Sequence, residues 1–340
     1  MTDSSPFRIG LVGAGYWGKN YLRLLGNMEG VRLAFVVDKS PGTLSLIDTS
    51  VPTFATISEA LTSKPADAAV IVTPPTTHTP LALECLNGGL DVLMEKPVAL
   101  SSEEMDEVRR ASERTGRIFF PGHIYTHNDW ISTLAGIVRA PSFGSLFYAT
   151  STRMGTGASR VAVGVLWDLA PHDLSILDLL GFGPPEEAMC LTRSFLGHPA
   201  EDTVFALIRY PHGRTAQLHL SWHSTTKVRD LLIVGSRQCG RFVEDRMDRP
   251  LTLSESSPHD PPGPGGLGPL ASVTPTDSAP SAIVREPLRN MVIAFVKACR
   301  AGAVPQPEVD RAIHVTRALE ALERSAKTGA EWVQLGHSHA

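Results

Sequence analysis

The sequence lacks several features that would assign a function at once. Its formal net charge is only −4 over 340 residues, so it has no overall positive charge of the kind that attracts nucleic acid or an anionic membrane surface. No apolar run approaches the length of a membrane-spanning helix. The first residues have no charged segment followed by an apolar one, so we expect no secretory signal. We therefore expect a water-soluble globular protein that binds neither nucleic acid nor membrane.

Cysteine is also scarce. The four cysteines are far apart in the sequence and form no Cys-x-x-Cys pair: Cys85, Cys190, Cys239 and Cys299. Such isolated cysteines are typical of small buried hydrophobic residues rather than of disulfides or metal ligands. We therefore expect no metal site, and a protein of the reducing cytoplasm.

Length and pattern divide the chain into two regions. A chain of 340 residues exceeds what one hydrophobic core usually spans, so two domains are expected. Up to about residue 121, short apolar runs alternate with amphipathic stretches, which is typical of βαβ units and a parallel sheet. The expected strands are Phe7–Val12, Val31–Val37, Ala68–Val72, Asp91–Met94 and Arg117–Phe120. The expected helices are Trp17–Leu25, Ile57–Leu61, Pro80–Leu86 and Ser101–Thr115, the last with Ser101 as its cap.

A different pattern follows Gly122. Closely spaced apolar runs predict a largely antiparallel sheet, with strands at Glu187–Phe195, Thr203–Tyr210, Thr215–His223, Val228–Val234 and Arg241–Glu244. Helices are expected at Asn128–Arg139, Trp167–Leu180, Glu286–Arg300 and Val309–Lys327. Residues 254–281 are rich in Pro, Gly and Ser, so we expect a mobile loop there. The predicted fold is α/β, with a doubly wound parallel sheet in residues 1–122 and an α+β domain with an open sheet in residues 123–340, closed by helices within 286–328.

A glycine-rich turn lies in the context that dinucleotide binding requires. Gly13-Ala14-Gly15-Tyr16-Trp17-Gly18 follows the first expected strand and opens the first helix. Gly13 allows a tight turn, Gly15 lets backbone approach a pyrophosphate, and Gly18 lets the helix pack closely on the strand. N–H groups at the start of the helix then face the phosphates. We predict an NAD-binding Rossmann domain with Tyr16 and Trp17 in its cofactor turn, while FAD and other nucleotides stay open as ligands.

Asp38 indicates which dinucleotide the turn binds. It ends the second strand about 20 residues after Gly18, where an acidic residue contacts the adenosine ribose. A carboxylate there accepts hydrogen bonds from both ribose hydroxyls and repels a 2′-phosphate. We therefore predict NAD rather than NADP, although the neighbouring Lys39, also expected at the cofactor, weakens that preference.

Glu95-Lys96-Pro97 is the first cluster suited to chemistry. It follows the strand Asp91–Met94, at the sheet edge where open α/β sheets bind ligands. Lys96 can hydrogen-bond a substrate hydroxyl and stabilise charge as that hydroxyl is oxidised. The alternative is an ordinary exposed lysine in a loop.

Asp168 and His172 form the second cluster. Their i, i+4 spacing puts them on one face of a helix. Because proline lacks an N–H, Pro171 predicts that both side chains lie near the start of that helix. A neutral histidine beside a carboxylate suits a general base. A capping aspartate and a structural histidine are the alternative.

The order of these motifs resembles one enzyme family. The glycine turn is followed by Thr73-Pro74-Pro75 with His78, by Glu95-Lys96-Pro97, by Gly122-His123 and by the Asp168/His172 pair. This order resembles the Gfo/Idh/MocA family, named after glucose–fructose oxidoreductase, inositol dehydrogenase and rhizopine catabolism. The resemblance covers nearly the whole chain.

The resemblance implies roles for these residues. A hydride would move between C4 of the nicotinamide and a sugar carbon, with Lys96 as hydroxyl partner and His172 as acid/base assisted by Asp168. The cofactor would be lined by residues from three of the motifs, namely Thr73, Pro74, His78, Glu95 and Lys96. The Lys96–Pro97 peptide would be cis, and Lys96, His172 and His123 would contact the substrate. The open sheet would carry the contacts of a homo-oligomer, a dimer or tetramer.

Two departures indicate a branch of the family. Ala170-Pro171-His172 replaces a common Gly-x-His, and Gly164-Val165-Leu166-Trp167 lacks a common Gly-Gly pair. The segment resembles a branch acting on nucleotide-linked sugars, which implies hydride transfer at a hydroxyl or keto carbon, C3, of such a hexose. Arg153 and Arg160 can pair with its diphosphate, or be ordinary surface arginines. A dehydrogenase of a free sugar, inositol or polyol and a non-catalytic dinucleotide sensor stay open.

Overall fold

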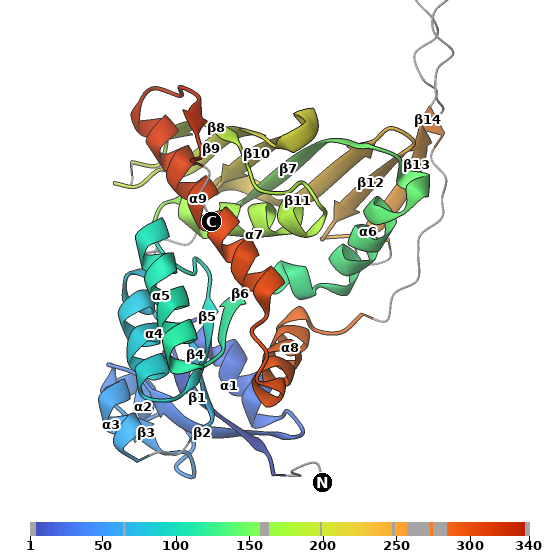
Figure 1. Cartoon of the computed structure of the whole chain (residues 1–340). Helices are drawn as coiled ribbons and strands as arrows, with labels where there is room; N and C mark the ends of the chain where they lie inside the picture. The colour runs from blue at the N-terminus through green and yellow to red at the C-terminus, as the bar shows by residue number, and fades with distance from the viewer. Residues whose placement is uncertain are drawn as a thin grey trace, which may run out of the picture. The chain divides into compact units, whose positions relative to one another are not determined.

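The chain folds into two compact units. The computed structural model describes residues 5–63, 66–156, 163–197, 199–246, 249–256, 273–274 and 284–336. The first unit comprises Met1–Ile124 and Glu286–Thr316, and the second comprises Tyr125–Arg285 and Arg317–Ala340. Each unit has its own sheet (Figure 1).

The first unit contains the predicted doubly wound sheet. Its strands are β1 (Phe7–Val12), β2 (Val31–Val37), β3 (Thr53–Phe54), β4 (Ala68–Ile71), β5 (Asp91–Glu95) and β6 (Phe119–Gly122). They pair in the order β3-β2-β1-β4-β5-β6, and every pair is parallel. This is the strand order of dinucleotide-binding Rossmann folds, with the reversal between β1 and β4. The two-residue strand β3 was not predicted because it is too short to show a pattern.

Helices cover both faces of this sheet. Helices α1 (Gly18–Gly26) and α8 (Pro287–Ala301) share one hydrophobic core. Helices α3 (Ile57–Thr62), α4 (His78–Asn87) and α5 (Ser102–Thr115) share the other, while the short α2 (Pro41–Leu44) follows β2. As predicted, Ser101 caps α5 by accepting a hydrogen bond from Glu104 N at 3.1 Å.

Helix α8 differs from the predicted domain assignment. We expected residues 286–328 to close the second domain, but Glu286–Thr316 belong to the first unit. Met291 and Phe295 are fully buried in the core shared with α1, and the Phe295 ring meets that of Phe120 at 5.7 Å between centroids. Helix α9 (Gln306–Lys327) contributes its first half to the first unit and its second half to the second unit. The amphipathic pattern predicted both helices, but it could not say which core each apolar face enters.

The second unit contains a nine-stranded sheet among its described residues. Its strands are β7 (Leu146–Thr156), β8 (Glu187–Arg193), β9 (Thr203–Arg209), β10 (Thr215–Ser221), β11 (His223–Gly235), β12 (Gln238–Val243), β13 (Leu251–Ser256), β14 (Val273–Thr274) and β15 (Val333–Gln334). All neighbours pair antiparallel except β7 and β10, so the predicted largely antiparallel sheet is confirmed. The prediction missed β7, an inner strand of this sheet.

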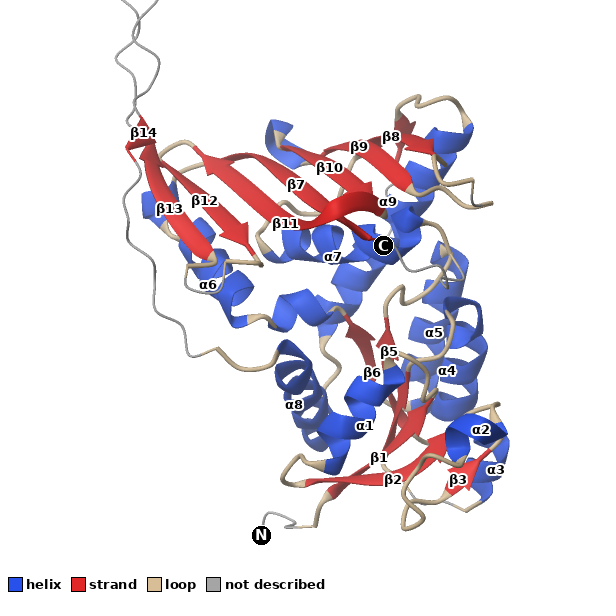
Figure 2. Ribbon diagram, turned by 180° about the vertical axis from the view of Figure 1, so that it is seen from behind, coloured by secondary structure: helices blue, strands red, loops and turns tan. Residues whose placement is uncertain are grey.

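One face of this sheet is covered by helices α6 (Asp129–Arg139) and α7 (Val165–Leu179) (Figure 2). Side chains alternate between the two faces along β7. Ala149, Ser151 and Arg153 are buried on the covered face, whereas Tyr148 on the opposite face is 45% exposed. The opposite face, which no described helix covers and which we call the uncovered face, carries a row of neighbouring side chains from three strands, Leu191, Phe205 and His219. The rings of Phe205 and His219 stack at 4.5 Å.

Helix α7 begins earlier than Pro171 predicted. Its first residue is Val165, so Pro171 lies inside the helix rather than in its first turn. An interior proline loses one helical hydrogen bond and typically costs about 3 kcal/mol. The start of α7 is anchored independently, because Glu201 accepts hydrogen bonds from Val165 N through its carbonyl and from Leu166 N through its carboxylate, both at 3.1 Å. Long-range anchoring and deep burial thus outweigh the local preference of proline.

The other sequence features have mixed outcomes. Cys85 and Cys190 are buried, and burial raises the pKa of each thiol to about 12, whereas Cys239 and Cys299 are only partly buried. In the predicted loop 254–281, residues 254–256 extend β13 and residues 273–274 form β14, and the rest lies outside the described residues. Across the described ranges, none of the helices is long and apolar enough to cross a membrane.

Candidate active site

Five candidate segments of the first unit meet at one edge of its sheet. The glycine turn follows β1, Asp38 follows β2, Thr73 follows β4, Lys96 follows β5 and His123 follows β6. Because all six strands are parallel, their carboxyl ends share one edge, which is where open α/β sheets bind ligands. The fold therefore brings together residues that are more than a hundred positions apart in the sequence.

The glycine turn has the geometry that a dinucleotide needs. Gly13 has φ +97°, a conformation that favours glycine, and its N–H donates to Val37 O at 2.8 Å. A Cβ on Gly18 would lie 2.2 Å from Gly13 O, so only glycine lets α1 begin this close to the turn. A Cβ on Gly15 would meet nothing within 4 Å, which leaves its backbone open to a ligand. The turn thus fits a pyrophosphate at the start of α1.

Asp38 lies against this turn. Its Oδ2 accepts a hydrogen bond from Ala14 N at 2.8 Å, and its Oδ1 accepts one from Ser40 N at 2.9 Å. These bonds hold the carboxylate beside the turn, in the position predicted for a ribose ligand. Lys39, Tyr16 and Pro74 are exposed, Tyr16 at 92%. The carboxylate disfavours a 2′-phosphate and so fits NAD.

Glu95 connects the cofactor turn to the Lys96 segment. Its Oε1 accepts hydrogen bonds from Trp17 Nε1 at 3.0 Å and from Tyr21 Oη at 2.6 Å, and its Oε2 accepts one from Lys96 N at 3.1 Å. Burial raises the pKa of Glu95, against the lowering effect of these three donors, and burial also raises the pKa of Tyr21. We predicted Glu95 as a cofactor ligand, but both of its oxygens bond within the protein, so the geometry favours a structural link.

His78 connects two neighbouring loops of the same edge. Its Nδ1 lies 2.9 Å from Pro97 O and its Nε2 lies 2.8 Å from Thr73 O. Burial lowers the pKa of His78, which favours the neutral ring. A neutral imidazole has only one N–H, and both partners are carbonyl acceptors, so in that form only one of the two contacts is a hydrogen bond. The Lys96–Pro97 peptide is cis, as the resemblance implied. His123 is buried and Lys96 is partly exposed.

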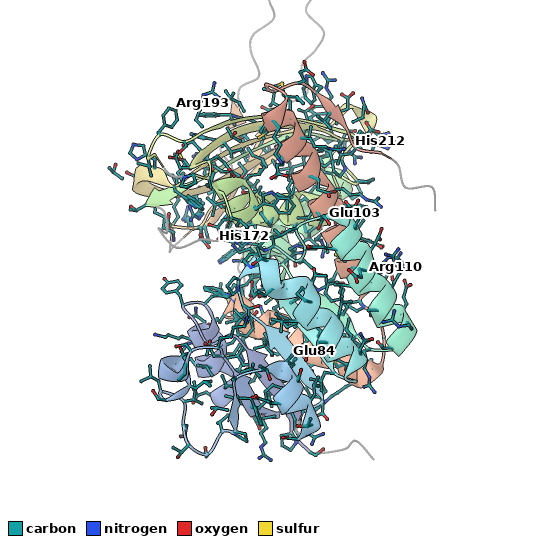
Figure 3. The ribbon with its side chains drawn as sticks, turned by 90° about the vertical axis from the view of Figure 1, so that its left-hand side faces the viewer. Glu84, Glu103, Arg110, His172, Arg193 and His212 are labelled. Carbon is teal, nitrogen blue, oxygen red and sulfur yellow. The ribbon has the colours of Figure 1, made fainter. Side chains whose placement is uncertain are left out.

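Asp168 and His172 come from the second unit. Both lie within α7, so the predicted common face is confirmed, and both are partly exposed (His172 is labelled in Figure 3). Asp168 Oδ2 accepts a hydrogen bond from Trp222 Nε1 at 3.2 Å. The N-cap of α7 is Gly164 rather than Asp168, so the alternative of a capping aspartate does not hold. Helix α7 therefore presents a carboxylate and an imidazole on one face, the two groups expected for acid–base chemistry.

Arg153 is not placed as expected for a diphosphate ligand. Its side chain is 6% exposed and pairs with Asp173, which is 1% exposed. Nε and Nη2 of Arg153 bond to the Asp173 carboxylate at 2.9–3.2 Å, and Nη1 donates to Tyr125 Oη at 2.9 Å. A buried guanidinium whose three nitrogens each bond within the protein contradicts the surface reading and gives no support to the diphosphate reading. Arg160 lies outside the described residues.

Several residues around these groups were not predicted: Tyr21, Tyr125, Asp173, Trp222 and Glu244. Tyr21 lies one helical turn after Trp17, and Asp173 follows His172 directly, but neither spacing identifies a partner. Tyr125 Oη donates to Glu244 Oε1 at 2.9 Å across 119 residues of sequence. No local pattern reports a contact over that separation, so only the fold could find it.

The sequence matches one family in both units. Residues 7–123 match the Gfo/Idh/MocA oxidoreductase family with an NAD-binding Rossmann fold, and residues 142–239 match the C-terminal domain of the same family. The predicted resemblance is thereby confirmed.

Curated relatives have varied activities. The chain is 24% identical to 2,7-anhydro-N-acetylneuraminate hydratase of Mediterraneibacter gnavus, over 61% of this chain and 59% of the relative. It is 31% identical to 4-carboxy-2-hydroxymuconate-6-semialdehyde dehydrogenase of Sphingobium sp., over 50% of this chain and 57% of the relative. It is 27% identical to UDP-N-acetylglucosamine 3-dehydrogenase of Acidithiobacillus ferrooxidans, over 52% and 55%. The chain thus matches less than two thirds of the length of each, and these names do not agree on a substrate.

Solved structures share the whole architecture. GenD2 from gentamicin A biosynthesis, solved with NAD, aligns with a TM-score of 0.82 at 20% identity, over 98% of this chain and 97% of that one. The WlbA dehydrogenase of Bordetella pertussis, solved with NADH and UDP-GlcNAcA, aligns with a TM-score of 0.80 at 21% identity, over 98% and 100%. At such identities the likeness shows the fold. With the two family matches, the strand order and the glycine turn, it establishes that this chain belongs to the Gfo/Idh/MocA family of NAD-binding oxidoreductases.

Proposed function

We propose that this protein is an NAD-dependent dehydrogenase or ketoreductase that transfers a hydride at C3 of a nucleotide-linked hexose. The observation that carries the chemistry is the joint presence of a cofactor turn that fits NAD, Lys96 at the carboxyl end of β5, and the Asp168/His172 pair on α7. A dinucleotide sensor without turnover has no need of an acid–base pair, so this set favours an enzyme.

The chain's own residues have distinct tasks in this proposal. Bound NAD supplies the carbon that accepts the hydride. The Lys96 ammonium hydrogen-bonds the substrate hydroxyl and stabilises negative charge on its oxygen. Neutral His172 accepts the hydroxyl proton, and the Asp168 carboxylate on the same helix face stabilises the imidazolium that results. His123, buried at the end of β6, is proposed as a further substrate contact.

The substrate class is supported by relatives rather than by an observed anion site. UDP-N-acetylglucosamine 3-dehydrogenase is a relative, and WlbA was solved with a UDP-linked sugar. The segment around α7 also resembles the branch that acts on nucleotide-linked sugars. One observation favours the second candidate, a dehydrogenase of a free sugar, inositol or polyol. Arg153 pairs with Asp173, so it does not supply the positive charge that a substrate diphosphate requires.

Ligand-induced stabilisation distinguishes the two substrate classes. The melting temperature would be measured with NADH, alone and with UDP-N-acetylglucosamine, dTDP-glucose, GDP-mannose, glucose or myo-inositol. A ligand that binds only the folded protein raises its stability by mass action. Stabilisation by NADH and one nucleotide sugar, followed by NADH formation with that sugar and NAD, supports the proposal. Stabilisation and turnover with a free sugar or inositol would replace it by the second candidate, and tight NADH binding without turnover would favour a sensor.

The roles of Lys96 and His172 are tested by substitution. Lys96→Met and His172→Gln should each lower kcat by about 10²–10⁴-fold, because each removes a general acid–base or charge-stabilising group. If both groups act in one chemical step, the double variant should lose less than the product of the two single losses. Turnover within a few-fold of wild type in either single variant would remove that residue from the mechanism.

We also propose a homo-oligomer formed through the uncovered sheet face. Leu191 and Phe205 are 39% and 43% exposed there, and with His219 they form a continuous row across β8, β9 and β10. Large exposed apolar side chains that adjoin one another are typical of an interface. Phe205→Glu should convert the oligomer to monomer in light scattering, and a wild-type monomer would contradict the proposal.

A further inference from the structure

A buried polar network lies next to His172 in the second unit. Asp173, the next residue on α7, is fully buried and pairs with Arg153 of β7. Ser151 Oγ, two residues earlier on β7, donates to Asp173 Oδ1 at 2.8 Å. The carboxylate therefore accepts from two side chains of one strand, which attaches the middle of α7 to the sheet beneath it.

Tyr125 extends this network to the His172 ring itself. Arg153 Cζ lies 4.5 Å from the centroid of the Tyr125 ring, and its Nη1 bonds to Tyr125 Oη. The Tyr125 ring packs edge-on against the His172 ring, with 4.9 Å between centroids and 63° between planes. Oη of Tyr125 also donates to Glu244, at the end of β12. The phenol is thus held by two charged partners while its ring contacts the imidazole.

Stability alone does not account for such a network. A buried arginine–carboxylate pair is often no better for stability than well-packed apolar residues, because desolvation offsets the attraction between the charges. The pair does fix the relative orientation of its two side chains, because the planar guanidinium bonds to the carboxylate in a defined geometry. Here that geometry is applied to the residue next to His172 and, through Tyr125, to the ring of His172.

We infer that Arg153, Asp173 and Tyr125 are positioning residues that hold the His172 imidazole in one orientation. The inference rests on the proposed function only in that His172 is the acid/base. Arg153 thereby takes a role in the site different from the diphosphate contact that the sequence suggested. None of the three residues needs to touch substrate or cofactor for this role.

The first test observes the His172 ring without any turnover. Histidine-labelled protein would be studied by NMR, with His172→Gln used to assign the His172 signals. Arg153→Lys keeps the charge beside Asp173 but removes the planar fork, and it leaves Tyr125 in place. We expect lower order of the His172 ring in this variant. Arg8→Met is the matched control, because it removes an arginine–aspartate pair of similar geometry in the first unit, and it should leave the His172 ring unchanged.

The second test uses kinetics and a rescue at position 125. Tyr125→Leu removes the ring that contacts His172 and should lower kcat by about 10- to 100-fold, since small misplacements of a reacting group cost about that much. Its KM for NADH should stay within about twofold, because the cofactor turn belongs to the other unit. Tyr125→Phe keeps the ring against His172 and beneath the Arg153 guanidinium but loses the Oη bonds, so it should recover part of the lost kcat.

The two tests separate failure of the inference from failure of the proposed function. Unchanged order of the His172 ring in Arg153→Lys overturns the inference, whatever the turnover. Equal losses of kcat in Tyr125→Leu and Tyr125→Phe, with an unchanged ring in both, also overturn it. Lower ring order in Arg153→Lys together with full turnover by His172→Gln would leave the positioning intact and remove the proposed role of His172. If Tyr125→Leu does not fold, Arg153→Lys and its ring order decide the question.

Discussion

The two units each contain an arginine–aspartate pair with two-point contact, Arg8–Asp67 and Arg153–Asp173, and these two pairs differ chiefly in their surroundings. Arg8 bonds to Asp67 through Nη2 at 2.6 Å and Nε at 3.3 Å, and the two side chains are 44% and 35% exposed. Arg153 bonds to Asp173 at 2.9 Å and the two side chains are 6% and 1% exposed. The first pair lies at the start of β1, at the sheet edge opposite the cofactor turn, and the second adjoins His172. The same type of ion pair is thus solvated in the first unit and buried in the second.

The comparison extends to how each unit builds its candidate residues. In the first unit, five candidate segments each follow the end of a parallel strand, so the sheet brings their backbones to one edge. In the second unit, the Tyr125 ring contacts the His172 ring, and Tyr125 in turn bonds to Arg153 and Glu244 from separate parts of the chain. The first arrangement depends on backbone geometry, and the second depends on side-chain pairing across long sequence separations. The predictions below test that difference.

The largest expected effect is on the buried pair. Arg153→Met should lower the free energy of unfolding by about 3–5 kcal/mol, because it leaves the buried Asp173 carboxylate without its charge partner. Arg8→Met should cost no more than about 1 kcal/mol, since its pair is solvated. Urea denaturation followed by circular dichroism would measure both. Equal losses would show that burial does not separate the two pairs.

Two substitutions in the glycine turn should have different effects on folding stability and on NAD binding. Gly18→Ala places a Cβ 2.2 Å from Gly13 O, and such overpacking should cost about 1–3 kcal/mol of stability as well as NAD affinity. Gly15→Ala meets no atom within 4 Å, so it should fold like wild type but bind NAD at least about tenfold more weakly, because close backbone approach is lost. Calorimetric titration and thermal melting would measure the two quantities. Unchanged NAD affinity in Gly15→Ala would place the pyrophosphate elsewhere.

Glu95→Gln tests the link between the turn and Lys96. The amide group of glutamine must face either Lys96 N or the Trp17 and Tyr21 donors, so donors oppose one another in a buried place. We expect a loss of about 2 kcal/mol in unfolding free energy, the usual cost of an unsatisfied buried group. Glu104→Gln is the control, because Glu104 also accepts from a backbone N–H and a hydroxyl but is partly exposed. A similar loss in both variants would mean that the buried bonds of Glu95 contribute no more to stability than the partly exposed bonds of Glu104.

The smallest expected effect concerns pH and His78. Burial lowers the pKa of His78 in the folded protein below the ordinary value near 6.5. Below that value the unfolded chain binds a proton that the native protein does not, so stability should fall as the pH decreases towards the folded pKa. His78→Gln should flatten this slope by at most one proton, measured as unfolding free energy against pH. His219→Gln should flatten it less, because the His219 pKa is lowered at a more accessible site. An unchanged slope in His78→Gln would show that the ring is not held neutral.

Much of the first unit could be predicted from local patterns. The positions of five strands and the cap at Ser101 follow from apolar runs and capping chemistry, although the last of these strands begins at Phe119 rather than at Arg117. The strand β7 was missed although it carries Arg153. Its sequence mixes polar and apolar residues, because its inward side chains pair with buried polar groups of α7. Pro171 misled the prediction for the opposite reason, since a local preference was outweighed by contacts with distant Glu201.

The sequence by itself determined the family, the two-unit plan, the nature of the cofactor and the helix face that joins Asp168 to His172. Each of these depends on residues that are close together in the sequence, or on the order of motifs along the chain. Only the tertiary structure decided that α8 belongs to the first unit and that Glu95 bonds to other residues of the protein. It also decided that Arg153 pairs with Asp173. An arginine side chain has the same five N–H donors in any sequence context. Which acceptor it meets depends on where the fold buries it, and the order of residues in the chain does not show this.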